Sequence, residues 1–337
     1  MRAKVVCGFW MIFFAAAFFL PSDLLTAADR VPVIFDTDMG NDIDDALALS
    51  ILHAGIERGR CDLLAVTVTK PGTTAAEYVQ MVNSWYRHPD IPIGMTTKDI
   101  LPAPGGYIEK VLADARERFQ WETKSYETAV PVLRRALATA KDSSVVMVQV
   151  GFSTNLADLL DSPADDISPL TGRELVALKV RLLLMMAGGF TEEYRAHKEF
   201  NVVNDVPSAQ KLVTQWPTPI QFSGFEIGPV IAMPGRSMAN DYGWTDWHPV
   251  RDSYDTLFGF DKNAWAWDLT CALVALYPDE GFFTMSEPGT VTVRDDGTTF
   301  FTPDADGKHS LFLIPTAEQA ARVRQAFVLL CSEPRKN

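Results

Sequence analysis

A short acidic turn between an apolar run and an apolar helix pattern constrains this chain most. Residues 31–35 are almost entirely apolar, and residues 36–45 then carry five aspartates. Aspartate and asparagine commonly begin helices, and Gly40 gives the turn a permissive backbone, so capping alone explains one or two of these acids. Five carboxylates exceed that need, because closely packed like charges repel unless a cation, protons or solvent offset them.

The place of the turn predicts what offsets the charge. Glycine-containing turns at the carboxyl end of a strand are where open α/β sheets bind ligands. Hard divalent cations prefer clustered oxygen ligands. The sequence therefore favours a metal site over a simple capping turn.

Strand and helix patterns alternate along most of the chain. A helix pattern over 44–55 is followed by a buried strand pattern over 62–69, a helix over 74–86 and a short strand over 91–94. Such alternation predicts right-handed crossovers and a mostly parallel sheet flanked by helices. We therefore expect a single doubly wound α/β domain over 29–337 with a small C-terminal β-hairpin region. The further elements expected are helices over 107–119, 129–140, 264–276 and 316–331, strands over 144–150, 180–186, 220–224, 290–294, 298–302 and 311–314, and a loop or lid over 236–261.

The first residues predict export. Arg2 and Lys4 precede an apolar run over 5–20, and residues 26–28 are small, as in a secretory signal peptide cleaved after Ala28. An uncleaved membrane anchor is the alternative, but the run is shorter than the roughly 20 residues of a spanning helix. We expect a signal peptide over 1–28 and a mature protein that is periplasmic or secreted and has no membrane contact after cleavage.

The net charge and the cysteine content limit the possible binding partners and disulfides of the protein. With a formal net charge of −13, the chain is a poor nucleic-acid binder, because phosphate contacts need clustered Lys and Arg. After cleavage Cys61, Cys271 and Cys331 remain, and an odd number allows at most one disulfide. Cys61 and Cys271 lie in apolar runs and are expected to be packed thiols.

Five motifs follow one another at predicted strand ends and helix starts. They are Asp36-x-Asp38-x-Gly40, Asp44-Asp45-Ala46, Thr154-Asn155-Leu156-Ala157, Glu199-Phe200-Asn201 and Asp268. In this order they resemble the inosine-uridine preferring nucleoside hydrolases, over about residues 31–278. The resemblance implies a nucleoside hydrolase-like fold and a calcium-dependent N-glycosidase that cleaves a ribonucleoside into ribose and free base. It also implies a dimer or tetramer.

The resemblance implies a role for each matching residue. Asp38 resembles a Ca²⁺ ligand that takes the proton from the attacking water. The other implied protein ligands are Asp45, the backbone carbonyl of Thr154 and Asp268. The implied sugar-binding residues are Asp44, Glu199 and Asn201, with Met186 near the sugar and Asp36 as a supporting acid.

These residue types also suit the chemistry without the family. Cleavage of an N-glycosidic bond passes through an oxocarbenium-like state, which nearby carboxylates stabilise. A bound cation fixes the water while a carboxylate accepts its proton. Taken alone, Glu199 is equally well a surface acid and Asn201 a turn residue.

Three features depart from the family pattern. The segment Asn41-Asp42-Ile43 lengthens the acidic turn by two residues, so either Asp42 or Asp44 faces the sugar. Lys70-Pro71-Gly72 stands where many members have an asparagine. Trp267 stands where a histidine often protonates the leaving base. A purine-specific branch stacks the base on a tryptophan there, and Trp267 resembles that arrangement; packing in the core is the alternative.

Two other functions fit parts of the sequence. Asp36-x-Asp38 also fits the nucleophile and acid of a haloacid-dehalogenase-like phosphohydrolase, but the later Gly-Asp-x-x-x-Asp motif of that fold is missing. A secreted ribose- or nucleoside-binding protein that kept the pocket without turnover is the second alternative, and the missing histidine favours it.

Overall fold

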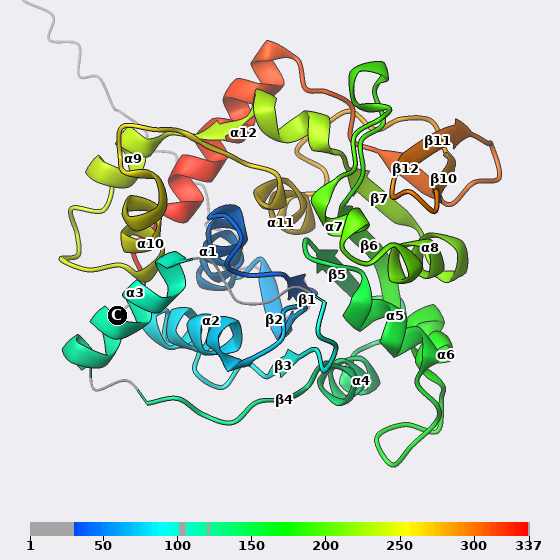
Figure 1. Cartoon of the computed structure of the whole chain (residues 1–337), viewed down its shortest axis with the longest axis horizontal. Helices are drawn as coiled ribbons and strands as arrows, with labels where there is room; N and C mark the ends of the chain where they lie inside the picture. Colours follow the sequence, from blue (N-terminus) through cyan, green and yellow to red (C-terminus); the bar gives the residue numbers. More distant parts are fainter. Residues whose placement is uncertain (1–29, 101–105, 120–121, 336–337) are drawn as a thin grey trace, which may run out of the picture.

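A ten-stranded sheet runs through the middle of the molecule, with helices on both faces (Figure 1). The computed structural model describes residues 30–100, 106–119 and 122–335, so the signal peptide predicted over 1–28 lies outside the described residues. The strand order is β11-β10-β12-β7-β6-β5-β1-β2-β3-β4. Its strands are β1 (Val31–Thr37), β2 (Cys61–Val68), β3 (Ile93–Met95), β4 (Glu127–Thr128), β5 (Val145–Gln149), β6 (Val180–Met186), β7 (Ile220–Ser223), β10 (Gly289–Val293), β11 (Thr299–Pro303) and β12 (His309–Leu311).

Two groups of helices cover the two faces (Figure 1). One face carries α1 (Asp44–Glu57), α2 (Thr73–Trp85), α3 (Gly106–Phe119), α9 (Gly235–Asn240), α10 (Pro249–Phe258), α11 (Asp268–Leu276) and α12 (Ala317–Cys331). The other carries α4 (Ala129–Thr139), α5 (Thr154–Asp161), α6 (Gly172–Lys179) and α8 (Val206–Gln215). Shorter pieces are α7 (Phe200–Val203), the 3₁₀ turns η2 (Glu192–Tyr194) and η3 (Phe225–Val230), and the pair β8 (Ala232–Met233) and β9 (Ala264–Trp265).

The central strands are buried on both sides, which explains their nearly continuous apolar sequences. In β1 the side chains of Val33 and Phe35 pack into one hydrophobic core and Ile34 packs into the other. This is the alternation that a strand imposes, and a parallel sheet covered by helices on both faces requires apolar residues at every position.

The order in which successive strands join the sheet reverses at β1. From β1 the chain adds β2, β3 and β4 on one side, and it then returns to add β5, β6 and β7 on the other, all pairing in parallel. The loops after β1 and β5 therefore part in opposite directions and leave a crevice at the carboxyl edge, where doubly wound folds bind ligands.

The fold confirms the expected doubly wound α/β architecture, and the C-terminal hairpin extends the main sheet. β10 pairs antiparallel with β11, while β12 pairs parallel with β7. The strand expected over 311–314 is found two residues earlier, as β12.

Two expectations about the late part of the chain are wrong. The segment 236–261 is not a loop or lid, since it contains most of α9 and all of α10, which begins at Pro249 and buries Val250 and Tyr254. Its Trp and Tyr side chains pack into the hydrophobic core beside it. The helix expected over 264–276 starts only at Asp268, because Ala264 and Trp265 pair with β8.

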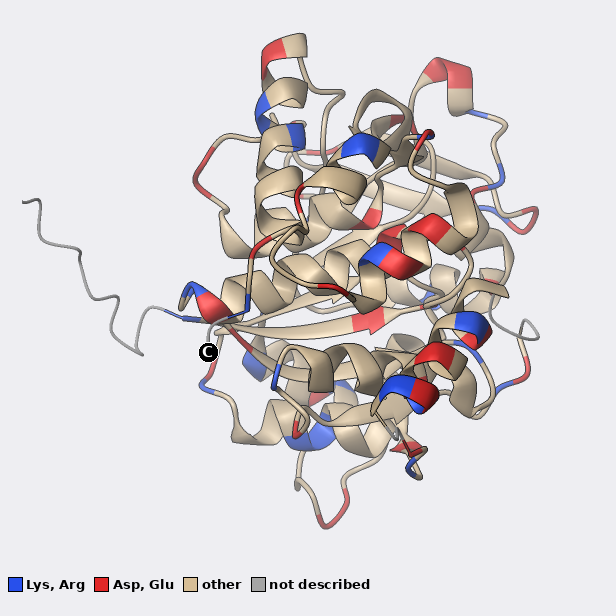
Figure 2. Ribbon diagram, turned by 90° about the vertical axis from the view of Figure 1, so that its left-hand side faces the viewer, with Lys and Arg blue, Asp and Glu red and all other residues tan. Residues whose placement is uncertain are grey.

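The remaining surface and cysteine features are unremarkable for a folded globular chain. Lys and Arg lie scattered over separate helices and loops in the view of Figure 2, and those coloured there form no continuous stripe. Cys61, Cys271 and Cys331 are buried free thiols. In the part of the chain that the structure describes, no helix has the length and apolarity to cross a membrane.

Candidate functional site

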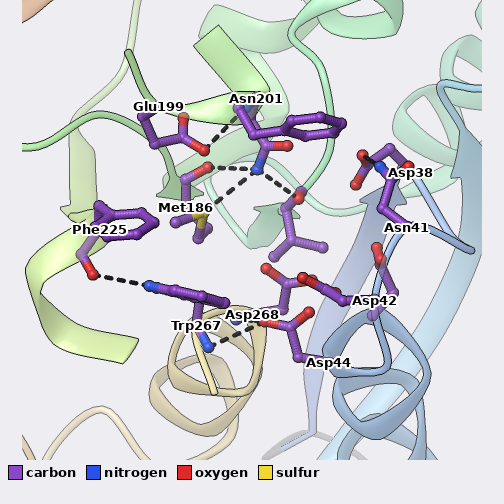
Figure 3. Close-up of a pocket in the computed structure, with 13 residues that line it drawn as sticks. Asp38, Asn41, Asp42, Asp44, Met186, Glu199, Asn201, Phe225, Trp267 and Asp268 are labelled. Carbon is purple, nitrogen blue, oxygen red and sulfur yellow. Dashed lines mark hydrogen bonds between the residues drawn. The ribbon is translucent and has the colours of Figure 1, made fainter. Parts of the chain in front are cut away.

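A cavity of about 280 Å³ opens at the carboxyl edge, beside the ends of β1, β5 and β6. Figure 3 shows Asp38 and Asn41 at one end of it and the rings of Phe225 and Trp267 at the other. Nine of the eleven predicted site residues line it: Asp38, Asp42, Asp44, Asp45, Met186, Glu199, Asn201, Trp267 and Asp268. Asp36 and Thr154 do not line it. The other lining residues are Asn41, Val150, Phe200 and Phe225.

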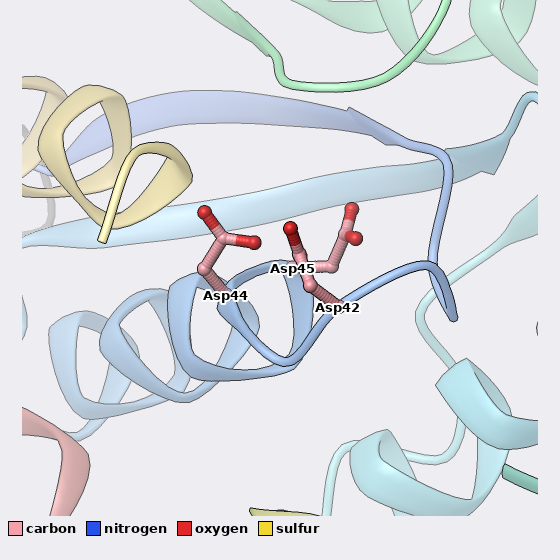
Figure 4. A group of neighbouring side chains, drawn as sticks. All are labelled: Asp42, Asp44 and Asp45. Atoms are coloured by element: carbon pink, nitrogen blue, oxygen red, sulfur yellow. The ribbon is translucent and has the colours of Figure 1, made fainter. Parts of the chain in front are cut away.

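The acidic turn places three carboxylates together at the start of α1 (Figure 4). One oxygen each of Asp42, Asp44 and Asp45 lies within 4.8 Å of the others. Both Asp42 and Asp44 line the cavity, so the lengthened turn supplies one more acid than the family pattern implies.

Mutual repulsion and burial dominate the electrostatics of the acidic end. Burial raises the pKa of Asp38 well above its usual range, and Asp45 and Asp42 raise it further. Burial likewise raises the pKa of Asp268, with Asp44 and Asp45 adding to the effect. For Asp45 burial raises the pKa to about 8, again helped by Asp42. So many buried carboxylates are costly unless a cation or protons offset their charge.

The donor set fits a hard divalent cation. Asp38, Asp45 and Asp268 line the cavity after β1 and at the starts of α1 and α11, and the carboxylate oxygens that lie within 4.8 Å of one another are those of Asp42, Asp44 and Asp45. Oxygen-only donors without cysteine or histidine match Ca²⁺ or Mg²⁺ better than zinc. Thr154 begins α5 and its hydroxyl donates to Asp205 at 2.6 Å; its proposed carbonyl ligation stays a prediction.

Asp44 joins α1 to α11. Its Oδ2 accepts hydrogen bonds from the backbone N–H groups of Trp267, at 3.0 Å, and Asp268, at 3.2 Å. An acid at a helix N-terminus satisfies unpaired N–H groups and meets the positive end of the helix dipole. Asp44, the residue expected to bind ribose, therefore also fixes the start of α11.

Glu199 and Asn201 form a rigid polar corner above the cavity (Figure 3). Glu199 accepts hydrogen bonds from the N–H groups of Asn201, Gly188 and Val202, and burial raises its pKa to about 7. The Asn201 amide nitrogen donates to the carbonyls of Val150, at 2.8 Å, and Met186, at 3.2 Å. These bonds orient the Asn201 amide, so that its oxygen is left for a ligand.

The aromatic end is held by backbone contacts. The Trp267 indole N–H donates to the Phe225 carbonyl at 2.8 Å, and the two rings lie 5.2 Å apart with a 33° tilt. A Cβ on Gly228 would lie only 2.1 Å from the indole nitrogen, so a glycine is needed for this approach. Trp267 thus packs on the core on one side and lines the cavity on the other.

Asp36 supports the site from within the sheet. Its Oδ1 accepts from Thr67, at 2.5 Å, and from Asn155, at 2.8 Å, while burial raises its pKa to about 7. These bonds tie together the ends of β1 and β2 and the start of α5; the supporting role that the resemblance implies for Asp36 stays a prediction.

Sequence reasoning missed four contributors. Phe200 lies inside the Glu-Phe-Asn motif and Phe225 follows directly after β7, so their positions at the carboxyl edge were the available signal. Asn41 and Lys70 were noted only as departures. The Lys70 ammonium donates to the Asn41 side-chain oxygen, and the Asn41 amide donates to Asp38.

Comparisons with known proteins agree with this geometry. A profile of the family described as inosine-uridine preferring nucleoside hydrolase matches residues 33–325. No curated protein sequence matches the chain.

Solved structures share the fold. A plant nucleoside hydrolase has 20% identity and a TM-score of 0.63, covering 90% of this chain and 100% of its own. A purine-preferring ribonucleoside hydrolase from Gardnerella vaginalis has 17% identity and a TM-score of 0.65, covering 89% and 98%. An inosine-uridine preferring nucleoside hydrolase from Bacillus anthracis has 15% identity and a TM-score of 0.66, covering 89% and 99%.

Proposed function

Because the chain belongs to the inosine-uridine preferring nucleoside hydrolase family, and is thus a hydrolase of N-glycosyl compounds, we propose that it releases ribose and free base from ribonucleosides with the help of Ca²⁺. The observation that carries this proposal is the division of one cavity into an acidic end and an aromatic end (Figure 3). Ribose occupies the acidic end and the base lies against the rings. The haloacid-dehalogenase alternative has no support from the family match.

The acidic end binds and orients the sugar. Oxygens of Asp42, Asp44, Glu199 and Asn201 accept hydrogen bonds from ribose hydroxyls. As the glycosidic bond breaks, positive charge develops on the ribose ring, and the surrounding carboxylates stabilise it. Because these carboxylates are already buried and fixed, little reorganisation is needed during the reaction.

Asp38 is the residue we assign to the water. Asn41 holds one of its oxygens, and Asp38 lines the cavity, so the carboxylate accepts the proton of the attacking water. Asp38, Asp45, Asp268 and the Thr154 carbonyl are the protein groups that would hold Ca²⁺. When bound, the cation offsets the carboxylate repulsion and makes its water more acidic.

Trp267 is the residue we assign to the leaving base. Its ring lines the cavity opposite Asp38, and stacking on an aromatic side chain is worth about 1–3 kcal/mol per base. No histidine is found among the described residues that line the cavity. We therefore propose a preference for purine bases, whose larger rings stack more strongly and whose ring nitrogens accept a proton from water.

The wider context of the protein is also proposed from its sequence. A signal peptide over 1–28 would export the mature chain to the periplasm or the medium, and N-terminal sequencing of the exported protein should then begin at Asp29. A dimer or tetramer is expected from the family, and sedimentation of the mature protein measures it.

Base release is the decisive experiment. The mature protein is incubated with purine and pyrimidine ribonucleosides and Ca²⁺, and free base and reducing sugar are measured. We expect release, fastest from purine nucleosides. If no nucleoside is cleaved at high protein concentration while calcium-dependent nucleoside binding is retained, the protein is a binding protein with this fold, and hydrolysis is refuted.

Asp38→Asn tests the assigned proton acceptor. The substitution keeps the size of the side chain but removes its basicity, so kcat should fall at least about 100-fold in a folded protein. Asp62→Asn is the matched control, because Asp62 is an exposed acid on β2 that pairs with Arg30. Its kcat should stay unchanged. Full activity in Asp38→Asn would contradict the assignment.

A further inference from the structure

Lys70 is a buried lysine next to the acidic turn. It follows β2, where the Thr69 N–H donates to the Thr37 carbonyl at 2.9 Å and holds the two strand ends together. Only 1% of Lys70 is exposed. An ammonium group taken out of water is costly unless negative charge and hydrogen bonds surround it. The neighbouring carboxylates of Asp38, Asp42 and Asp45 supply that charge.

The ammonium reaches these carboxylates through an amide. Lys70 Nζ donates to Asn41 Oδ1, and Asn41 Nδ2 donates to Asp38 Oδ2. Lys70 takes part in none of the ion pairs found among the described residues, so Asn41 is its link to the site. Asn41 belongs to the lengthened part of the turn, so Lys70 and the lengthened turn act together on Asp38.

The position of Lys70 decides the kind of role it has. Asp38 and Asn41 line the cavity, but Lys70 does not. The ammonium is therefore set back from the cavity, and its influence on a bound nucleoside passes through Asn41 and through its electric field. Charged hydrogen bonds are stronger than neutral ones, so the chain from Lys70 to Asp38 restricts rotation of the carboxylate.

We propose that Lys70 is a positioning residue with two effects. Through Asn41 it holds the Asp38 carboxylate in one orientation. Through its positive charge it lowers the affinity of the acidic cluster for a divalent cation. The inference rests on the proposed function. It also assigns a role to two residues of the lengthened turn. Asn41 links Lys70 to Asp38, and the Asp42 carboxylate offsets part of the Lys70 charge.

The two effects predict opposite changes in Lys70→Met. This substitution keeps an unbranched side chain only one atom shorter and removes its charge. Without the nearby positive charge, calcium should bind about tenfold more tightly, because like charges at short range in a buried site repel strongly. Without the link to Asn41, Asp38 is free to rotate, and kcat should fall about 10- to 100-fold with KM changing less than about threefold.

A double-mutant cycle tests the link itself. Asn41→Ala breaks the same chain and should lower kcat by a similar factor, and the Lys70→Met/Asn41→Ala double variant should be no slower than the worse single variant. Lys98→Met is the control, because Lys98 is an exposed lysine of the same sheet edge that pairs with Asp158. Its kcat and calcium affinity should match those of the wild type.

Calcium titration calorimetry and steady-state kinetics decide the outcome. Unchanged kcat in Lys70→Met, equal or weaker calcium binding, or losses that multiply in the double variant would each overturn the proposal. If Lys70→Met does not fold, Asn41→Ala decides alone: wild-type kcat refutes the link and a fall at unchanged KM supports it. If the wild type neither binds calcium nor releases base, the proposed function is wrong and this inference falls with it.

Discussion

Trp267 is fixed from three directions, although it is the residue that departs most from the family pattern. Its backbone N–H is bound by Asp44, its indole N–H is bound by the Phe225 carbonyl, and its ring lies against the backbone at Gly228. A side chain held in this way loses little freedom when a base stacks on it, so the stacking energy is available for binding.

Gly228→Ala should push the indole out of place, because the new methyl group would overlap it. We expect KM for purine nucleosides to rise about tenfold, matching the loss of about 1.4 kcal/mol of stacking, with kcat changed much less. Gly243→Ala, where nothing lies within 4 Å, is the control and should behave as wild type. An unchanged KM in Gly228→Ala would show that the base does not use this ring.

At the scale of elements, the site depends on two helices whose first turns meet at the cavity. α1 and α11 pack against each other, and Asp44 of α1 accepts two backbone hydrogen bonds at the start of α11. This contact links the acidic turn, near the beginning of the chain, to the last predicted metal ligand, Asp268.

Replacing Asp44 in two ways separates its hydrogen bonds from its charge. Asn retains an acceptor for the N–H groups of α11, whereas Ala leaves them unpaired. In calcium-free buffer the free energy of unfolding of Asp44→Ala should therefore be about 1 kcal/mol lower than that of Asp44→Asn. Urea denaturation measures the difference, and equal stabilities of the two variants would mean that the bonds contribute nothing.

The interface of α1 with α2 makes stability depend on pH. His53 is buried there, hydrogen-bonded to Asn83 at 2.9 Å and to His88 at 3.0 Å. Burial, together with the nearby His88, lowers its pKa to about 3. The unfolded chain takes up this proton near pH 6.5, while the folded chain stays neutral, so the stabilising contribution of neutral His53 is lost as the pH falls from about 6.5 toward 3.

Between pH 7 and pH 5 this residue alone should lower the free energy of unfolding by about 2 kcal/mol. Urea denaturation at the two pH values measures the loss, and His53→Gln, which does not titrate, should show a loss smaller by that amount. Equal losses in both proteins would disprove the contribution of His53.

For the whole molecule, the buried acids make folding and metal binding interdependent. Asp268 at the start of α11 is far in the sequence from Asp38 and Asp45 of the acidic turn, so an unfolded chain offers no comparable site. Calcium at about 100 times its dissociation constant should raise the free energy of unfolding by about 2.7 kcal/mol, and a chelator should reverse this. Asp268→Asn should reduce the gain. A melting temperature that does not respond to calcium would argue against the metal site.

The sequence alone determined the alternating architecture and most of the site. Buried strands such as residues 180–186 are apolar at nearly every position, and the acids that follow a strand necessarily reach the carboxyl edge of a parallel sheet. These features are local, so residue types and spacing predict them. The aromatic residues around α10 misled the prediction because their packing partners lie elsewhere in the chain.

Only the tertiary structure decided how the expanded turn is used. It directed Asp42 into the cavity, tied Asp44 to α11, and brought Lys70, which follows β2, to Asn41 of the turn. Each of these contacts joins segments that are distant in the sequence or depends on the path of two extra residues. A side chain's direction there is set by the close packing of several elements at once, and no local pattern contains that information.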